Sequence, residues 1–391
     1  MRALNTQKLD KSKAKKSCAM LLLFLTVLNF HHYYTFQPLH KSTRSSCVTT
    51  QRHICQQDEV VVDGRHGNRL LVFGLGNIGK NAAIKSCSVL NSTTPYFNEV
   101  FGTTRSNEKL DGIQVLGIAE VSMILPTCSH ILVTVPPIDI ESSTKTMNVT
   151  VGGRPKRWDF LCDPILNHPN LNLCESLQPN TWVGYISSTS VYGNHDGDWV
   201  TETSRIKCLP GSKSGLYYRA ENEWRKAALG WGWRLHVFRC AGLYGDERSI
   251  LHTLMKSGGH DIAAAASGGG NTTKYPTSRI HEEDVTRSII HAMGLNKPDS
   301  GQCCIWNIAD DNPAPRSEVT MYGYNLFEIS GIKPFDNTTR MMRSSSQRDE
   351  RRRIESKKVS NQRVKANLLP DGKLIYPTYR EGLKAVLDKN K

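Results

Sequence analysis

Three glycines with the spacing G-x-G-x-x-G form the first group of residues in the chain that could do chemistry. They directly follow the apolar run 70–73, and the run 80–88 behind them has a composition suited to a helix. A glycine turn between a strand and a helix lets the backbone approach a pyrophosphate, whose charge the helix N-terminus attracts. An ordinary turn is the alternative interpretation of this pattern. The residues that the pattern predicts to bind a dinucleotide are Gly74, Gly76, Asn77, Ile78 and Gly79.

The end of the next expected strand, at 99–105, indicates which nicotinamide cofactor the turn would hold. No acidic residue stands at this end to bind a ribose 2′-hydroxyl. Thr103 and Thr104 offer hydroxyls and Arg105 a guanidinium, and these groups suit a 2′-phosphate. The sequence therefore favours NADP over NAD, and a merely solvated arginine after the strand is the alternative.

Two further strand ends carry residues suited to a cofactor cleft. The carboxyl ends of parallel strands open onto the same cleft. Val135 and Pro136 end one expected strand and Ser187 ends another, so we expect all three residues to contact the cofactor. The strands in question are separated by stretches long enough for crossover helices and are expected at 113–116, 130–135 and 181–187.

This alternation of strands and helical stretches predicts an α/β fold with a Rossmann-type, doubly wound parallel sheet. We expect the dinucleotide-binding domain to span residues 69–310 and a small C-terminal substrate lobe to span 311–391. The lobe contains the basic run 340–365, which lacks the aromatic residues that would stack on bases. We expect this run to be a solvated surface loop.

The net charge of +14 resides almost wholly in two segments of the chain. Residues 1–57 hold nine basic side chains against the single acidic Asp10, and the run 340–365 holds ten basic side chains against three acidic ones. The remainder is close to neutral. This distribution argues against a groove that follows nucleic acid.

The first of these basic segments has the layout of a targeting leader. A lysine-rich start precedes the apolar run 18–30, which is short for a membrane span, and basic, hydroxyl-rich sequence continues to Asp58. This layout favours a cleaved bipartite leader that directs the protein to a plastid, with Phe36 as the candidate junction. A secretory signal or a retained membrane anchor are the alternatives, and we expect no membrane contact for the mature body.

The cysteines give no indication of a covalent or metal framework. The chain has eleven of them, an odd number, and only Cys303 and Cys304 stand side by side. Such scattered spacing predicts neither a disulfide scaffold nor a zinc site. We therefore expect no metal centre.

Several short motifs occur in an order that resembles a known superfamily. Besides the glycine turn they include S-S-x-x-V-Y-G from Ser187, F-R-x-x-G-x-Y-G from Phe238 and R-I-H-x-x-D from Arg279. Together they resemble the extended short-chain dehydrogenases/reductases, also called the NAD-dependent epimerase/dehydratase superfamily, over nearly everything behind the leader. The segments at 135–137 and 376–380 look most like its atypical YeeZ-like subgroup. The resemblance implies a Rossmann domain with a small substrate lobe and nicotinamide-dependent chemistry.

One departure from that superfamily concerns its catalytic Tyr-x-x-x-Lys, in which the tyrosine moves a proton and the lysine lowers the pKa of the tyrosine. This chain has no such motif, and at the matching spacing Lys213 and Tyr217 stand in transposed order. Ser188 holds the place of the superfamily's catalytic hydroxyl, so we expect Ser188, Lys213 and Tyr217 to be catalytic. Alternatively, Lys213 is solvated, Tyr217 packs at the start of a helix that runs to Leu229, and the protein binds a dinucleotide without catalysis.

The resemblance also implies which residues contact the substrate. An Asn-x-Arg segment that lines the substrate side in the superfamily has a counterpart at 361–363. We expect an NAD(P)-dependent oxidoreductase or epimerase/dehydratase-like enzyme that acts on an unidentified small molecule such as a sugar nucleotide. A homodimer is one oligomeric state compatible with this expectation. The residues expected to bind this substrate are Tyr192, Arg239, Asn361 and Arg363.

Overall fold

The computed structural model describes residues 68–87, 97–105, 109–138, 162–257, 275–295, 298–332 and 356–389. The expected leader at 1–57 and residues 340–355 of the basic run lie outside the described residues. Within the described ranges, no helix is long and apolar enough to cross a membrane, and no three potential metal ligands are grouped together.

A sheet of seven parallel strands forms the centre of the fold. The order of its strands is β10-β7-β5-β4-β1-β2-β3, so the chain adds strands outward on both sides of β1. This order confirms the predicted doubly wound Rossmann-type sheet, and it opens a crevice beyond the carboxyl ends of β1 and β4. The strands are β1 (Arg69–Phe73), β2 (Glu99–Thr103), β3 (Gln114–Val115), β4 (His130–Val133), β5 (Trp182–Ser188), β7 (Arg234–Cys240) and β10 (Cys303–Ile308).

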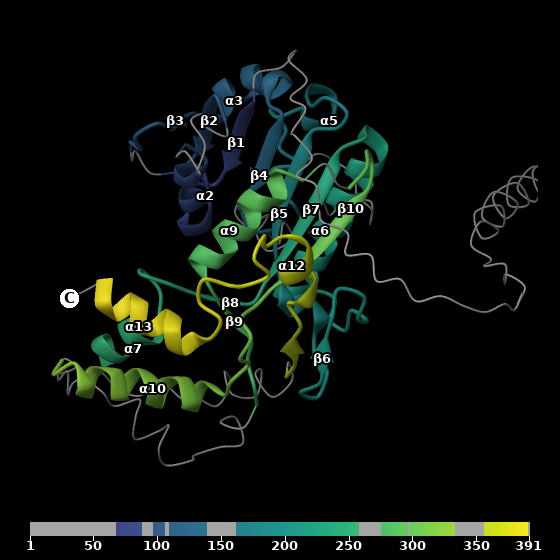
Figure 1. The fold of residues 1–391 in the computed structure, drawn as a ribbon. Coiled ribbons are helices and arrows are strands. Elements are labelled where there is room, and N and C mark those ends of the chain that lie inside the picture. Colours follow the sequence, from purple (N-terminus) through teal and green to yellow (C-terminus); the bar gives the residue numbers. More distant parts are fainter. Residues whose placement is uncertain are drawn as a thin grey trace, which may run out of the picture. The chain divides into compact units, whose positions relative to one another are not determined.

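Helices cover both faces of this sheet (Figure 1). Along β1, Leu70 and Val72 pack into one apolar cluster and Leu71 and Phe73 into another, because successive side chains of a strand point to opposite faces. Both faces are therefore buried, as parallel sheets require. The first cluster includes residues of α2 (Asn77–Cys87) and α9 (Glu282–Met293); the second includes residues of α3 (Ile118–Ile124), α5 (Leu173–Ser176) and α6 (Lys213–Trp231).

A smaller lobe has an apolar cluster of its own, in which Leu251, Phe327 and Leu383 are buried. Its helices lie near a two-stranded parallel sheet of β8 and β9 (Figure 1). The lobe draws on β8, α7 and β9, which precede residue 310, so its core begins inside the range predicted for the Rossmann domain. Its elements are β8 (Gly242–Tyr244), α7 (Ile250–Ser257), β9 (Arg279–His281), α10 (Arg316–Ile329) and α13 (Tyr379–Lys389).

The end of the basic run is folded into the body of the protein. Val359 and Val364 are both 1% exposed, because they pack into the apolar cluster beneath α2 and α9. The prediction of a solvated loop over 340–365 is therefore wrong for its last part, where burial of these two valines fixes the backbone. The elements concerned are β11 (Lys358–Val359), which pairs with β6 (Trp199–Val200), and α12 (Gln362–Asn367).

Candidate active site

The glycine turn after β1 is held by both neighbouring strands. Gly74 has a φ of 92°, its N–H donates to Thr103 Oγ1 at 3.1 Å, and its carbonyl oxygen accepts from Thr134 Oγ1 at 2.6 Å. A Cβ at Gly79 would overlap the Gly74 carbonyl oxygen, so only glycine lets α2 begin this close to the turn. A Cβ at Gly76 would have no described atom within 4 Å, so this part of the turn faces open space.

A cavity of about 620 Å³ opens in front of this turn. Its wall combines the turn with the carboxyl ends of β5 and β7, the start of α6, and Lys357 and Val359 near the C-terminus. The cavity therefore lies where a doubly wound sheet places a dinucleotide. The sequence-predicted residues in its wall are Gly76, Asn77, Ile78, Pro136, Ser187, Ser188, Lys213 and Tyr217.

The other residues predicted to bind the cofactor are not among those that line the cavity. Gly74 and Gly79 belong to the turn itself, and Val135 packs against the second apolar cluster. Thr104 and the exposed Arg105 follow the end of β2, beside the turn. The Thr103 hydroxyl accepts the hydrogen bond from the Gly74 N–H and thereby joins the end of β2 to the turn.

The start of α6 brings the predicted catalytic residues together. Ser212 caps this helix, because its Oγ accepts from the Gly215 N–H at 3.1 Å. The helix begins at Lys213, so Tyr217 lies one turn from its N-terminal end. Residues four apart share one helix face. Lys213 and Tyr217 accordingly both line the cavity, and Ser188 enters it from the end of β5.

The hydroxyl groups of this site can donate protons. Burial, with a smaller contribution from Cys240, raises the pKa of Tyr217, so the phenol stays protonated near neutral pH. Ser188 Oγ accepts from the Ser190 N–H at 3.2 Å, which fixes the oxygen and leaves its hydrogen to donate. Tyr217 is therefore suited to act as an acid rather than as a base, and Ser188 to hydrogen-bond a substrate oxygen.

Tyr192 and Arg239, which we expected to bind substrate, lie in the protein interior instead. The Arg239 guanidinium donates to both carboxylate oxygens of Glu221, at 3.0 and 2.7 Å, and to the Tyr192 hydroxyl at 3.0 Å. Tyr192 in turn donates to Asn307 at 2.6 Å, and Ser187 donates to Glu221 at 2.6 Å. Tyr192 and Glu221 are 0% exposed and Arg239 1%. The network supports the end of the sheet from below the cavity.

The charge states of Arg239 and Tyr192 follow from their burial and from their partners in this network. Burial alone would lower the pKa of Arg239, but the hydrogen bonds that it donates to Glu221, together with the negative charge of that carboxylate, outweigh this effect and raise the pKa. Burial also raises the pKa of Tyr192. The arginine is therefore charged and the tyrosine neutral, so a charged pair is enclosed in the interior.

Replacing Glu221 should unfold the protein more readily, because Arg239 would remain as a buried charge without its partner. We expect Glu221→Ala to lower the free energy of unfolding by about 3–5 kcal/mol in urea denaturation. Asp371→Ala is the control: it removes an exposed ion pair between Asp371 and Arg287, and should change stability by less than about 1 kcal/mol. Equal effects of the two substitutions would contradict this role of the network.

Asn361 and Arg363 do not reach the cavity either. Asn361 is 5% exposed and its Nδ2 donates to the Ala309 carbonyl at 2.8 Å and to Asp311 Oδ1 at 2.7 Å. The Arg363 guanidinium lies over the Trp306 ring, 4.9 Å from its centroid. The prediction of substrate contacts for this pair is corrected: the two side chains anchor α12 against the end of β10.

A second cavity, of about 300 Å³, adjoins the first on the side of the lobe. Arg248 lines both cavities, whereas Arg279 and Arg316 line only the second. The Arg279 guanidinium is held in place by the carbonyl oxygens of Thr277 and Ala314, at 2.7 and 2.8 Å. The lobe thus contributes three guanidinium groups to the site.

The sequence did not identify these cationic residues as part of the site. Arg248 and Lys357 enter the cavity walls from segments beside β8 and β11, which are only three and two residues long. Such short strands leave no alternating pattern that could be recognised. The R-I-H-x-x-D motif that begins at Arg279 was the one sequence feature near these residues, and its spacing does not indicate that Arg279 lines a cavity.

Comparison with known proteins locates the fold among solved structures. No protein-family model and no curated protein match the chain. A conserved protein of unknown function from Silicibacter pomeroyi is 26% identical, with a TM-score of 0.56 over 82% of this chain and 99% of that one. The UDP-glucose 4-epimerase of Thermotoga maritima, solved with UDP-glucose, is 17% identical, with a TM-score of 0.54 over 82% and 97%. MoeE5, solved with UDP-glucose and NAD, is 18% identical, with a TM-score of 0.54 over 83% and 99%. These likenesses confirm the α/β Rossmann-type fold.

Proposed function

We propose that the chain is a member of the NAD-dependent epimerase/dehydratase superfamily that acts on a nucleotide sugar with the help of a bound nicotinamide dinucleotide. The observation that carries this proposal is a single cavity whose wall holds the open glycine turn together with Ser188, Lys213 and Tyr217. We also propose that the chain belongs to the YeeZ-like subgroup of this superfamily, and this assignment rests on the sequence motifs alone. The proposal is also supported by the likeness of the fold to a solved UDP-glucose 4-epimerase and to MoeE5, which was solved with UDP-glucose and NAD.

The residues of the cavity can perform each protein-dependent part of such a reaction. A bound nicotinamide would supply or accept a hydride. The backbone at Gly76 and the N-terminus of α2 would hold the pyrophosphate of this cofactor. In the reducing direction, Ser188 would donate a hydrogen bond to the carbonyl oxygen and Tyr217 would give this oxygen the proton that balances the incoming hydride. In the oxidising direction, the Tyr217 oxygen would take the proton of the sugar hydroxyl as the hydride leaves, and Lys213 would add positive charge beside the developing oxyanion.

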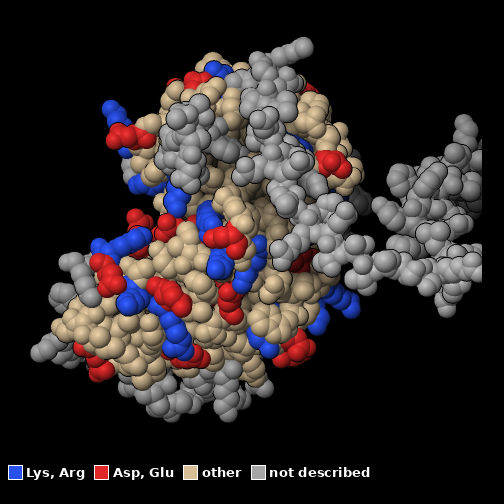
Figure 2. Space-filling view, viewed as in Figure 1, with Lys and Arg blue, Asp and Glu red and all other residues tan. Residues whose placement is uncertain are grey.

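The charge of the cavity walls favours an anionic substrate. On the face drawn in Figure 2, Lys and Arg side chains are interspersed with Asp and Glu. The described residues that line the two cavities, by contrast, include no aspartate or glutamate. A diphosphate group would find cationic partners there. The cationic residues of the two walls are Lys213, Arg248, Arg279, Arg316 and Lys357.

A second candidate function is dinucleotide binding without catalysis, as in a redox sensor. It is favoured by the transposed order of Lys213 and Tyr217, since the usual Tyr-x-x-x-Lys is missing from the sequence. The two candidates differ in turnover and agree on cofactor binding. Incubation of the full-length chain with NADP⁺ and, in separate reactions, UDP-glucose, UDP-galactose or UDP-glucuronate tests them. The proposal predicts cofactor reduction or sugar interconversion with at least one substrate, whereas NADPH binding without turnover of any of them favours the sensor.

We further propose that NADP is preferred over NAD, on the strength of Thr104 and Arg105 beside the turn. Arg105→Ala should weaken the affinity for NADPH about tenfold and leave that for NADH unchanged, because a charge-assisted hydrogen bond contributes about 1.5–3 kcal/mol. Titration by nicotinamide fluorescence measures both affinities. Arg363→Ala serves as the control, since Arg363 lies outside the cavity. Equal affinities for NADPH and NADH in the unaltered protein would remove the assignment.

A further inference from the structure

The two hydroxyl groups assigned to the reacting oxygen come from two different elements. Ser188 is the last residue of β5, and Tyr217 lies in the first half of α6. Both must meet one substrate atom, so the reaction depends on the spacing between the end of this strand and the start of this helix. A contact that joins the two elements beside the cavity can therefore control the reaction without touching the substrate.

One such contact is the hydrogen bond that the Ser187 hydroxyl donates to Glu221 Oε1 at 2.6 Å. Ser187 directly precedes Ser188, and Glu221 follows Tyr217 by four residues, which places these two on one face of α6. Both partners of the bond are closed to solvent, with Ser187 3% and Glu221 0% exposed. The bond therefore joins close neighbours of the two reacting hydroxyls at a place where water does not compete for it.

The Glu221 carboxylate is itself held in a fixed orientation. The Arg239 guanidinium donates to both of its oxygens, at 3.0 and 2.7 Å. Arg239 in β7 lies opposite Ser187 in the parallel register of β5 and β7. One carboxylate thus binds the adjoining ends of two strands, whose next residues, Ser188 and Cys240, both line the larger cavity. Because two charge-assisted bonds fix the plane of the carboxylate, the bond from Ser187 fixes the end of β5 relative to α6.

We propose that Glu221 is a positioning residue that sets the distance between the Ser188 and Tyr217 hydroxyls through its hydrogen bond with Ser187. This inference rests on the proposed function and adds to it the contact that aligns the two hydroxyls. Without the bond, the end of β5 can shift against α6, and the two hydroxyls no longer meet one oxygen atom in the same geometry. Substrate and cofactor still bind, because the groups assigned to their phosphates lie in the glycine turn and in the lobe.

Ser187→Ala removes this bond and leaves the pair of Glu221 and Arg239 intact. We expect it to lower kcat about tenfold to hundredfold, the usual cost of a small misplacement of reacting groups. KM and the affinity for NADPH should change less than about threefold. Steady-state kinetics of the full-length chain, with whichever of UDP-glucose, UDP-galactose and UDP-glucuronate it converts, and fluorescence titration with NADPH measure these values. An unchanged kcat overturns the proposal.

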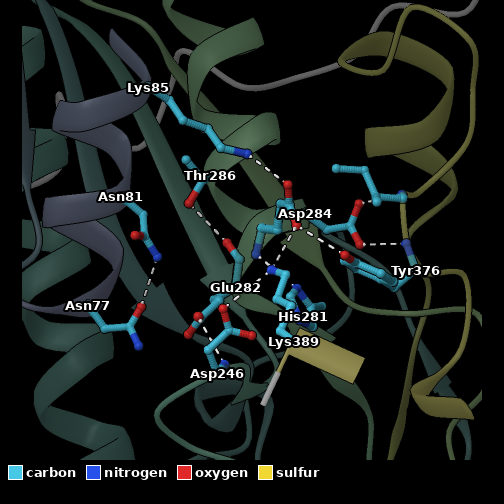
Figure 3. A network of polar contacts seen from close by, with 12 residues as sticks. Asn77, Asn81, Lys85, Asp246, His281, Glu282, Asp284, Thr286, Tyr376 and Lys389 are labelled. Atoms are coloured by element: carbon cyan, nitrogen blue, oxygen red, sulfur yellow. Dashed lines mark hydrogen bonds and ion pairs between the residues drawn. The ribbon is translucent and has the colours of Figure 1, made fainter. Parts of the chain in front are cut away.

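The matched control is a buried hydroxyl that donates one hydrogen bond away from the cavities. Thr286 in α9 is 0% exposed, and its Oγ1 donates to the Glu282 carbonyl oxygen at 2.9 Å (Figure 3). Thr286 lines neither cavity, so Thr286→Val should retain full kcat. Equal losses of kcat in Ser187→Ala and Thr286→Val would mean that loss of any buried hydroxyl slows turnover, which also overturns the proposal.

Combination with Tyr217→Phe separates positioning from a general structural role. If Glu221 acts by aligning Tyr217, Ser187→Ala should lower kcat less than about threefold further once the phenolic hydroxyl is absent, since the effects of residues that act together are not additive. A merely structural role would give the full further loss in this background. That outcome, or a loss of NADPH affinity as large as the loss of kcat, overturns the proposal while the proposed function stands.

A second variant covers a failure of Ser187→Ala to fold. Ser187→Cys places a weak donor of similar shape at the same position, and full kcat in that variant overturns the proposal equally. Absence of turnover of all three nucleotide sugars by the unaltered protein would instead remove the proposed function, and the inference with it.

Discussion

Gly76→Val should leave the protein folded and abolish its measurable affinity for NADPH. A Cβ at this position meets no described atom within 4 Å, so the protein itself can accommodate the side chain. The valine would occupy the space through which the pyrophosphate approaches the backbone. Loss of two charge-assisted hydrogen bonds, each contributing about 1.5–3 kcal/mol, weakens binding at least about hundredfold. Fluorescence titration measures the affinity, and circular dichroism verifies the fold.

Two other glycines provide the comparison for this result. A Cβ at Gly230, in α6, would likewise have no described atom within 4 Å. Gly230 is not among the residues that line the larger cavity. Gly230→Val should therefore bind NADPH normally. Gly79→Val should fail to fold, because its side chain would overlap the Gly74 carbonyl. Undiminished NADPH binding by Gly76→Val would show that the dinucleotide does not use this turn.

Tyr217→Phe should reduce turnover of an active nucleotide sugar about 10²–10⁴-fold, the usual contribution of a positioned acid or base. The affinity for NADPH should change less than threefold, since the phenol is assigned to the reacting oxygen and not to the pyrophosphate. Steady-state kinetics and cofactor titration of the same variant separate the two effects.

The neighbouring Tyr218 is the matched control for that substitution. It is partly buried against the first apolar cluster and is absent from both cavity walls. Tyr218→Phe should retain full turnover. An equal loss in both variants would mean that the effect comes from packing of α6, and full activity of Tyr217→Phe would remove this residue from the mechanism.

The central strands of the sheet could be predicted from the sequence because they are buried on both faces. Such strands appear as short apolar runs between turns, and their predicted ends lie within two residues of those in the structure, as for β1 and β4. The glycine turn was predictable because its three glycines lie within six residues of sequence, and two of them are required by their local surroundings. Gly74 needs a positive φ, and Gly79 needs contact with a backbone only five residues away.

The polar residues at the strand ends could not be assigned in this way. Arginine and tyrosine are common in binding sites, which is why Arg239 and Tyr192 were assigned to one. In the structure, however, Glu221 neutralises Arg239 and Asn307 accepts a hydrogen bond from Tyr192, and both partners come from other elements. Only tertiary structure reveals such partners. The same reason accounts for Asn361, whose amide contacts a residue 52 positions away.

The lobe was predicted least well because it is assembled from short, separated segments. Arg248, Arg279 and Arg316 come from three different parts of the chain and meet at one cavity. Between the first two lies a stretch outside the described residues, at 258–274. No local pattern in the sequence connects these arginines, although their common sign of charge is what favours an anionic substrate.

A crystal structure of the full-length chain with bound NADPH tests the central claim most directly, because it locates both ends of the dinucleotide. We predict that the pyrophosphate lies over Gly76 at the N-terminus of α2 and that the nicotinamide ring lies in the larger cavity, between Ser188 and Tyr217. A pyrophosphate bound elsewhere, or a nicotinamide ring outside the wall that these two residues share, would contradict this prediction.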